Sequence, residues 1–376
     1  MDMNVRSIAI PRLLSVGTGC LENLSQLLRE AGFDCLRACV ATGAGASGPF
    51  ARAVVEDLED NDVSVTVASG LQGTLEQAAE LARRVIEEGV DVLIAVGGGR
   101  VIDTGKLAAA RTGIPFISVP TTLSHDGITS PVASLSDVHG MRRSYGAAMP
   151  AGVVVDLGVV GSAPPRSLRS GLGDLCSNLT ALLDWRLAER HGADRFDPFA
   201  AMISESAVRP ALDLTSLADA ASAEILAKGL ILSGLAMAAA GTSRPCSGAE
   251  HLISHSLDVR LREGRRMHGE QVALGCLFTA AAHRSSLHGA LRDLFSRLGL
   301  PTDPSHLGLG RAEFLAAVRA APETRPGRFT ILSGASHDAS ALDMWFDLAF
   351  GNEASPASRS HRGQRGSGAA SSLTAL

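Results

Sequence analysis

Three histidines stand close together in the second half of the chain, in the stretch "EHLISHSLDVRLREGRRMHGEQ", residues 250–271. His251 and His255 are four positions apart, so on a helix they lie on one face and can point into the same cleft. His268 follows seventeen residues after His251, and a helix, a turn and an antiparallel helix would bring it back beside His251. A single histidine is more often a hydrogen-bonded structural residue, so the prediction of a site rests on the grouping.

The grouping is typical of a metal centre. Two imidazoles and one carboxylate leave a divalent ion with an open position for water or substrate, which is the pattern of catalytic rather than structural sites. Asp174, in "SGLGDLCSN", is the carboxylate candidate, and it faces the cleft if its glycine-rich approach is a turn. Spacing alone also leaves His255 as a candidate fourth ligand. Cys176 diverges from Asp174 on a helix and is expected in the core.

A glycine-rich turn in the first half is suited to a phosphate group. In "DVLIAVGGGRVIDTGKLAAA", residues Gly97, Gly98 and Gly99 lie between a strand and a helix. Glycine lets the backbone approach a diphosphate, and the helix that follows directs free N–H groups at the anion. The pattern is neither the common dinucleotide fingerprint nor a Walker loop, and a tight turn would also use glycine.

A second loop of small residues, "VPTTLSHDGITSP", follows the next predicted strand. Ligands of open α/β sheets bind outside the carboxyl ends of strands, so both loops are expected on one cofactor site. His125 and Asp126 lie in this loop among residues small enough to admit a ligand, although Asp-Gly is also a common turn dipeptide.

The elements that position these residues divide the chain. Up to about residue 160, short β-branched runs such as "VSVTVAS" and "GVVVDL" alternate with helical stretches such as "TLEQAAELARRVIEEG", which predicts a Rossmann-like parallel sheet. Ala- and Leu-rich helical stretches follow, without strand signals. We therefore expect an α/β dinucleotide-binding domain over residues 1–163, an all-α metal- and substrate-binding domain over 164–350, and a disordered tail over 351–376, which is rich in Ser, Gly, Ala and Arg.

Composition excludes several classes of protein. The chain has 376 residues, a net charge of -5 and a pI near 6.1, which argues against a nucleic-acid-binding protein. It has no uninterrupted apolar run of about 18 residues that would span a membrane, and its start lacks the apolar core of a signal peptide. The six cysteines show no CxxC spacing and are expected to be buried thiols of a reducing compartment. We expect a cytoplasmic protein, and assembly into a homo-oligomer is left open.

Five segments together resemble one family. "GGGRVIDTGKLAA", "PFISVPTTLSHDGITSP", "SGLGDLCSNLTALLDWRLA", "SRPCSGAEHLISHSLD" and "MHGEQVALG", in this order, resemble the sn-glycerol-1-phosphate dehydrogenases of the glycerol dehydrogenase and dehydroquinate synthase-like superfamily. The resemblance implies the dehydroquinate synthase-like fold. It also implies substrate contact by Asp126, Asp174 and His255, and a metal held by Asp174, His251 and His268.

The metal is expected to be zinc, with Fe²⁺ or Ni²⁺ as alternatives, because histidine and carboxylate ligands accept all three ions. The cofactor is expected to be NAD or NADP, and no acidic or basic residue in "ATGAGASG" selects between them. The glycine-rich turn suggests binding by Gly97, Gly98 and Gly99. The resemblance implies that two loops and a following serine bind the cofactor: Gly99, Arg100, Val101, Ile102, Asp103, Thr121, Thr122, Leu123, Ser124 and Ser130.

The resemblance implies a metal-dependent, NAD(P)H-linked oxidoreductase that interconverts dihydroxyacetone phosphate and sn-glycerol 1-phosphate. The metal would act as a Lewis acid, with Asp126 and His255 as catalytic residues that orient the substrate or relay a proton. One alternative is a dehydrogenase of another phosphorylated polyol or ketone. Another is a sugar-phosphate cyclase, although such enzymes carry several lysines and a glutamate at the first metal position, where this chain has two lysines in all and Asp174. A non-catalytic dinucleotide-binding protein is disfavoured because a buried metal triad without an ion would be costly.

Overall fold

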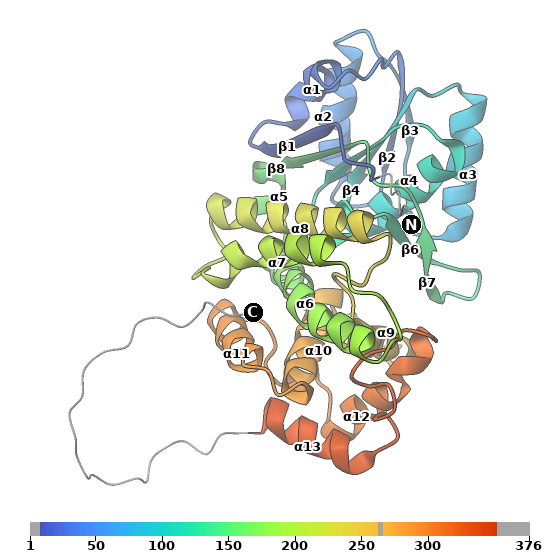
Figure 1. Ribbon diagram of the computed structural model, residues 1–376. Coiled ribbons are helices and arrows are strands. Elements are labelled where there is room, and N and C mark those ends of the chain that lie inside the picture. The colour runs from blue at the N-terminus through green and yellow to red at the C-terminus, as the bar shows by residue number, and fades with distance from the viewer. Residues whose placement is uncertain (1–7, 262–265, 352–376) are drawn as a thin grey trace, which may run out of the picture.

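The amino-terminal half is built on a parallel sheet. A computed structural model describes residues 8–261 and 266–351 (Figure 1), so the expected tail lies outside the described residues apart from Gly351. The sheet has six strands in the order β1-β8-β5-β4-β2-β3, and all neighbours are parallel. The strands are β1 (Leu13–Gly17), β2 (Arg37–Thr42), β3 (Ser64–Ala68), β4 (Val92–Gly97), β5 (Phe116–Pro120) and β8 (Gly152–Asp156). The predicted Rossmann-like sheet is confirmed.

Helices cover both faces of this sheet. Helices α1 (Leu24–Glu30) and α2 (Gly48–Glu59) share a core with one face, and α3 (Leu75–Glu87) and α4 (Gly99–Thr112) share a core with the other. Because the central strands are buried on both sides, they read as continuous apolar runs rather than as alternating patterns. The order of the strands reverses between β2 and β4, which is where ligands of such sheets bind.

A small antiparallel hairpin, which the sequence analysis did not identify, lies beside α4. It consists of β6 (Val132–Ser136) and β7 (Arg142–Gly146). The amine of Lys106 in α4 is fully buried and donates to the carbonyl oxygens of Gly127 and Val132 at 2.6 and 2.8 Å. Lys106 also pairs with Asp103 at 3.1 Å. Its ammonium group therefore holds this hairpin and the loop that follows β5, residues 121–131 (the β5 loop), against α4.

The carboxyl-terminal half is helical, as predicted. Its helices are α5 (Leu157–Gly161), α6 (Pro165–Arg190), α7 (Pro198–Leu212), α8 (Ala220–Ala240), α9 (Ala249–Arg260), α10 (His268–Ala282), α11 (Leu287–Leu298), α12 (Arg311–Ala320) and α13 (Ala339–Phe350). Helix α10 is at the centre, where it packs against α6, α9, α11 and α13 and is buried along almost its whole length. The domain boundary at residues 163 and 164 stays a prediction.

One helix, α8, is long and apolar enough to cross a membrane by length and composition alone. It packs against α6, α7 and the short helix η2 (Asp126–Ile128), and 61% of its apolar window is buried inside the protein. We therefore assign α8 to the core of this fold.

The glycine-rich approach to Asp174 is not the turn that the sequence suggested. It lies inside α6, and its glycines let backbones touch. A Cβ on Gly173 would overlap the carbonyl oxygen of Gly269 in α10, and a Cβ on Gly269 would overlap the carbonyl of Ser170. The Ser170 hydroxyl accepts a hydrogen bond from the Gly269 N–H at 3.0 Å and donates to the carbonyl of Ser124 in the β5 loop at 2.9 Å. This contact fixes α6, α10 and the β5 loop relative to one another.

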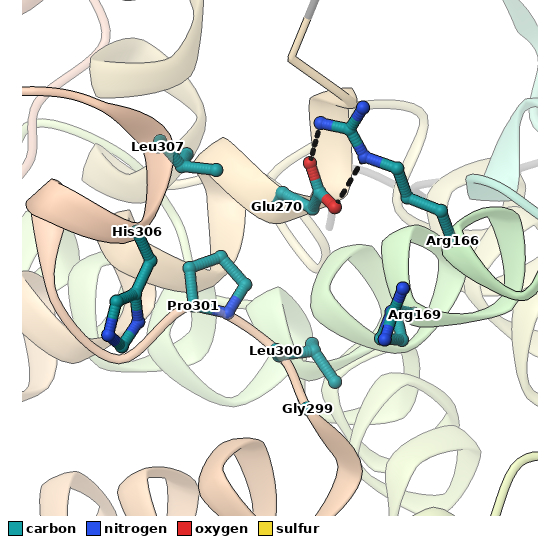
Figure 2. A pocket seen from close by; sticks show the side chains of 8 residues that line it. All are labelled: Arg166, Arg169, Glu270, Gly299, Leu300, Pro301, His306 and Leu307. Atoms are coloured by element: carbon teal, nitrogen blue, oxygen red, sulfur yellow. Dashed lines mark hydrogen bonds and ion pairs between the residues drawn. The ribbon is translucent and has the colours of Figure 1, made fainter.

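A second contact between α6 and α10 borders a cavity of about 220 Å³ (Figure 2). Arg166 of α6 donates two hydrogen bonds to the carboxylate of Glu270 in α10, at 2.7 and 2.5 Å. Such two-point pairs are geometrically specific, so this one helps to hold the amino-terminal ends of the two helices in register.

We expect Gly269→Ala to lower the free energy of unfolding by about 1 to 3 kcal/mol, because the added methyl group must displace the backbone of α6. Denaturant unfolding followed by circular dichroism measures the change. Gly289→Ala in α11 is the matched control, since no atom lies within 4 Å of its Cβ position, and it should raise stability by up to about 1 kcal/mol. Equal unfolding midpoints for Gly269→Ala and wild type would show that the close contact is unimportant.

Candidate active site

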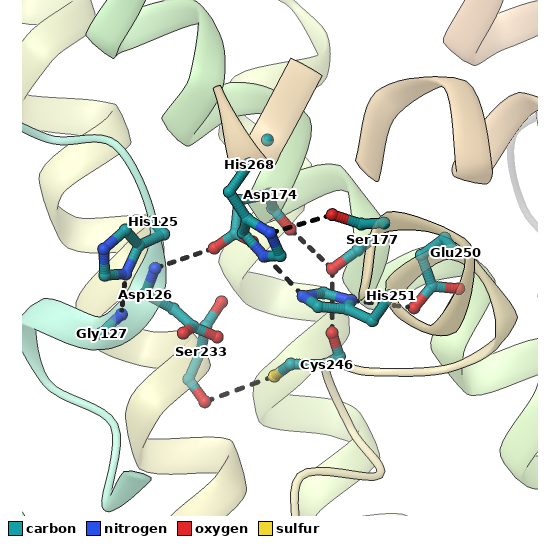
Figure 3. A network of polar contacts seen from close by, with 12 residues as sticks. His125, Asp126, Gly127, Asp174, Ser177, Ser233, Cys246, Glu250, His251 and His268 are labelled. Atoms are coloured by element: carbon teal, nitrogen blue, oxygen red, sulfur yellow. Dashed lines mark hydrogen bonds and ion pairs between the residues drawn. The ribbon is translucent and has the colours of Figure 1, made fainter. Parts of the chain in front are cut away.

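Three side chains from three helices meet between the two halves of the chain (Figure 3). Asp174 comes from α6, His251 from α9 and His268 from α10. The Asp174 Oδ1 atom lies 3.4 Å from Nε2 of His251 and 3.5 Å from Nε2 of His268, and the three ligand atoms lie within 4.8 Å of one another. The structure thus brings together the three residues that the sequence suggested as metal ligands, in an arrangement that could hold one divalent ion.

In His251 and His268, the ring nitrogen that faces away from Asp174, Nδ1, already has a hydrogen-bond partner. Nδ1 of His251 lies 3.1 Å from a carboxylate oxygen of Glu250, and Nδ1 of His268 lies 3.0 Å from the hydroxyl of Ser254. Histidines that bind metals commonly donate their second N–H to such a partner, which fixes the ring and its tautomer. Both rings therefore turn Nε2 toward Asp174.

Further contacts fix the direction of the hydrogen bonds behind His268. The Gln271 amide nitrogen donates to Asp258 at 3.0 Å, since a carboxylate can only accept. The Gln271 oxygen therefore faces Ser254 and accepts its hydroxyl proton at 2.8 Å. The Ser254 oxygen is left to accept from Nδ1–H of His268, so that Nε2 of His268 carries a free lone pair. We call this chain of contacts, formed by Asp258, Gln271, Ser254 and His268, the His268 relay.

The electrostatics of the group favour a cation. Burial raises the pKa of Asp174, but hydrogen bonds with His251 and His268 outweigh it and hold this pKa well below its usual range. Burial lowers the pKa of His251, but hydrogen bonds with Asp174 and Glu250 raise it to about 10. Asp174 and Glu250 are both buried and both pair with His251, so two carboxylates lie close to one ring. The donor set of two imidazoles and a carboxylate fits zinc, iron or nickel.

Asp126 and His255 lie beside this group rather than in it. The Asp126 N–H donates to Asp174 Oδ2 at 2.8 Å, and burial and then the charge of Asp174 raise the pKa of the Asp126 carboxyl to about 7. The His255 ring centroid lies 6.2 Å from that of His251. Burial, followed by nearby positive charges, lowers the pKa of His255 to about 3, so this ring is neutral at physiological pH.

The two cofactor loops lie against each other. The N-cap of α4 is Gly98, which has no side chain that could cap the first N–H groups of the helix. The Thr121 N–H donates to the carbonyl of Gly97 at 3.0 Å, which joins the ends of β4 and β5. The ring of His125 lies directly over Gly99, where a Cβ would overlap it. This arrangement could present the start of α4 to a phosphate group.

Several suggested cofactor residues point into the protein instead. Ile102 and Leu123 are fully buried, and Asp103 is bound to Lys106 and to the N–H of Ser134 at 3.1 Å each. Ser130 is also buried. These residues can meet a dinucleotide mainly through their backbone atoms.

Sequence reasoning missed the partners of the two histidines. Glu250 directly precedes His251, and adjacent residues do not face each other on a regular helix. Ser254 contacts His268 of the next helix, so this contact exists only once α9 and α10 pack together. A general expectation that metal-binding histidines have carboxylate or hydroxyl partners could have drawn attention to Glu250 and Ser254.

Comparisons first define the class of protein. A family model described as iron-containing alcohol dehydrogenase matches residues 15–164. The structure of a probable glycerol dehydrogenase from Sinorhizobium meliloti 1021 superposes with a TM-score of 0.72 and 23% sequence identity, covering 92% of this chain and 98% of that one. The fold is that of the iron-containing alcohol dehydrogenase and glycerol dehydrogenase class.

Sequence relatives narrow this class to one family. The glycerol-1-phosphate dehydrogenase [NAD(P)+] of Thermococcus kodakarensis is 40% identical over 72% of this chain and 76% of its own length. The enzyme of the same name from Methanosarcina mazei is 36% identical over 86% of this chain and 90% of its own. The chain belongs to the glycerol-1-phosphate dehydrogenase family, which confirms the resemblance seen in its motifs.

The His268 relay predicts an effect on metal affinity. Ser254→Ala removes the acceptor of the Nδ1 proton, so the ring is no longer fixed and we expect affinity for Co²⁺ to fall about 10- to 100-fold. Absorbance titration of metal-free protein with Co²⁺ measures this affinity without reference to turnover.

Ser256→Ala is the matched control. Within the described residues, Ser256 is also buried in α9 but forms no hydrogen bond with Asp174, His251 or His268, the three residues that we call the metal group. Its Co²⁺ affinity should equal that of wild type. A Ser254→Ala protein that binds Co²⁺ as tightly as this control would remove the relay from the site.

Proposed function

We propose that this chain is a metal-dependent, NAD(P)H-linked dehydrogenase that interconverts dihydroxyacetone phosphate and sn-glycerol 1-phosphate. The observation that carries the proposal is the meeting of Asp174, His251 and His268 between the helical half and the two cofactor loops. The names of its relatives, glycerol-1-phosphate dehydrogenase [NAD(P)+], support the reaction and the use of NAD(P). Zinc is the ion we expect first, with Fe²⁺ or Ni²⁺ as alternatives.

The protein's part in this reaction is to hold and orient the reactants. A metal held by Asp174, His251 and His268 would supply Lewis-acid chemistry at the ketone oxygen. The loops after β4 and β5 would bind the dinucleotide, which would supply the hydride for the ketone carbon. We assign Asp126 and His255 to the substrate hydroxyl and to transfer of the proton that the ketone oxygen gains, since both flank the metal group.

The environments of the two lysines argue against the cyclase alternative. Lys106 is enclosed in its pairing with Asp103, and Lys228 lies exposed on α8, where it pairs with Glu224 at 2.5 Å. Neither is available to surround a substrate phosphate in the cleft. Another phosphorylated ketone remains the nearest alternative substrate. We further propose a cytoplasmic location, in keeping with six free cysteines, of which Cys35 is half-buried and the others are buried.

The first test follows NADH and NADPH consumption by zinc-loaded protein given dihydroxyacetone phosphate. We expect metal-dependent oxidation of one or both cofactors and formation of the sn-1 enantiomer, measured with a stereospecific assay of the product. A chelator-treated sample should be inactive and should recover when zinc is restored. Absence of turnover with zinc, Fe²⁺ and Ni²⁺ alike would refute the proposal.

His251→Ala should lose bound metal and turnover together, because it removes one of three ligands. Metal content after dialysis, measured by mass spectrometry, and the rate of dihydroxyacetone phosphate reduction test this together. His139→Ala is the control, because this histidine is exposed in the turn between β6 and β7. If His251→Ala keeps both metal and activity, His251 does not belong to the centre.

A further inference from the structure

Three arginines gather near the start of α9, outside the metal group. Arg325 and Arg328 both donate to the hydroxyl of Ser243, at 2.8 and 2.9 Å. Arg244 follows Ser243 directly in the chain and pairs with Asp194 at 2.7 Å. We call Arg244, Arg325 and Arg328 the arginine cluster.

The arginine cluster carries more positive charge than its contacts balance. Among the described residues, Asp194 is the carboxylate within ion-pair distance, and it is paired with Arg244. Buried Glu250 is the second carboxylate whose charge acts on Arg328, so two carboxylates face three guanidinium groups. Arg328 is only 8% exposed, and burial, then the charges of Arg325 and Arg244, lower its pKa to about 9. Like charges held together out of water are costly unless an anion offsets them. The cluster is therefore suited to an anionic ligand.

The residues of the arginine cluster differ in their exposure and in their contacts. Arg328 also donates to the carbonyl of Ser247 at 2.7 Å, next to the residue that caps α9, so it is held inside the fold. Arg325 has an exposed side chain, and in the part of the chain that the structure describes its hydrogen-bond partner is Ser243. Arg325 is thus the member that can reach a ligand, while Arg328 and Ser243 hold it in place.

The position of Arg325 connects it with the metal group. It follows the short helix η4 (Ala321–Thr324), which packs against α9, the helix that carries His251 and His255. The positive charge of Arg325 is among the causes that lower the pKa of His255, together with that of Arg142 from β7. Arg325 therefore lies within electrostatic reach of His255.

We propose that Arg325, held by Ser243 beside Arg328, binds the phosphate monoester of the substrate and so selects phosphorylated over unphosphorylated ketones. This inference rests on the proposed function, since it concerns the substrate of the same site. Arginine suits the task because its planar fork matches phosphate oxygens at two points. The two lysines cannot replace it, because Lys106 is enclosed and Lys228 pairs with Glu224.

The test compares wild type with Arg325→Ala and Arg325→Lys on dihydroxyacetone phosphate and on dihydroxyacetone. We expect Arg325→Ala to raise KM for the phosphorylated ketone about 10- to 100-fold, in line with the loss of a charged hydrogen bond, with a smaller change in kcat. Activity on dihydroxyacetone should fall by a much smaller factor, and Arg325→Lys should recover part of the loss. Arg319→Ala, an exposed arginine of α12, is the control.

A binding measurement separates this inference from the proposed reaction. Inorganic phosphate should raise the melting temperature of metal-loaded wild type and of Arg319→Ala, but not that of Arg325→Ala. A KM for dihydroxyacetone phosphate within twofold of wild type, an equal loss on both ketones, or equal protection by phosphate in all variants would overturn the proposal. If wild type reduces no ketone, the proposed function fails, and phosphate protection alone then decides whether Arg325 forms an anion site.

Discussion

The arrangement of the site depends on one backbone contact, between α6 and the first turn of α10. Gly173 and Gly269 lack the side-chain atoms that would separate the two helices, and Ser170 joins them through its hydroxyl. Asp174 lies one residue beyond this contact on α6, and His268 lies one residue before it on α10. Any larger residue at the crossing would move these two side chains apart. Because Ser170 also holds the β5 loop, the contact sets the position of that loop relative to the metal group as well.

The sheet could be predicted because its signal is local. Each central strand is covered on both faces, which demands a short run of apolar residues, and such runs are visible without knowledge of the fold. The hairpin of β6 and β7 was missed although Ala133 and Leu135 are buried and their neighbours are not. Its stability comes from packing on α4 and from buried Lys106, which no local pattern reveals. The glycines before Asp174 were misread for a related reason, since a glycine that permits close helix packing looks the same in sequence as one that makes a turn.

In the candidate site, too, some residues could be inferred from local sequence and others depend on tertiary contacts. The spacing of His251 and His255 and the start of α10 at His268 could be inferred, because helix periodicity brings such residues to one side. The His268 relay joins Ser254 and Asp258 of α9 to Gln271 of α10, and its contacts exist only once the two helices dock. Ser243 and Arg325 lie even farther apart in the chain. Both lie in irregular segments, Ser243 after α8 and Arg325 after η4. Residues that position others are thus the least visible in sequence, because their role is defined by tertiary contacts.

The two oxygens of Asp174 face different parts of the protein. Oδ1 faces the histidines of the helical half, whereas Oδ2 accepts the N–H of Asp126 from the β5 loop. The occupancy of the metal group and the position of the β5 loop therefore act on one carboxylate. Linkage of this kind is reciprocal, so an ion that draws charge from Asp174 weakens its hold on the loop, and a loop that moves away leaves a carboxylate better able to bind the ion. Asp174 can in this way couple ion affinity to the position of the β5 loop.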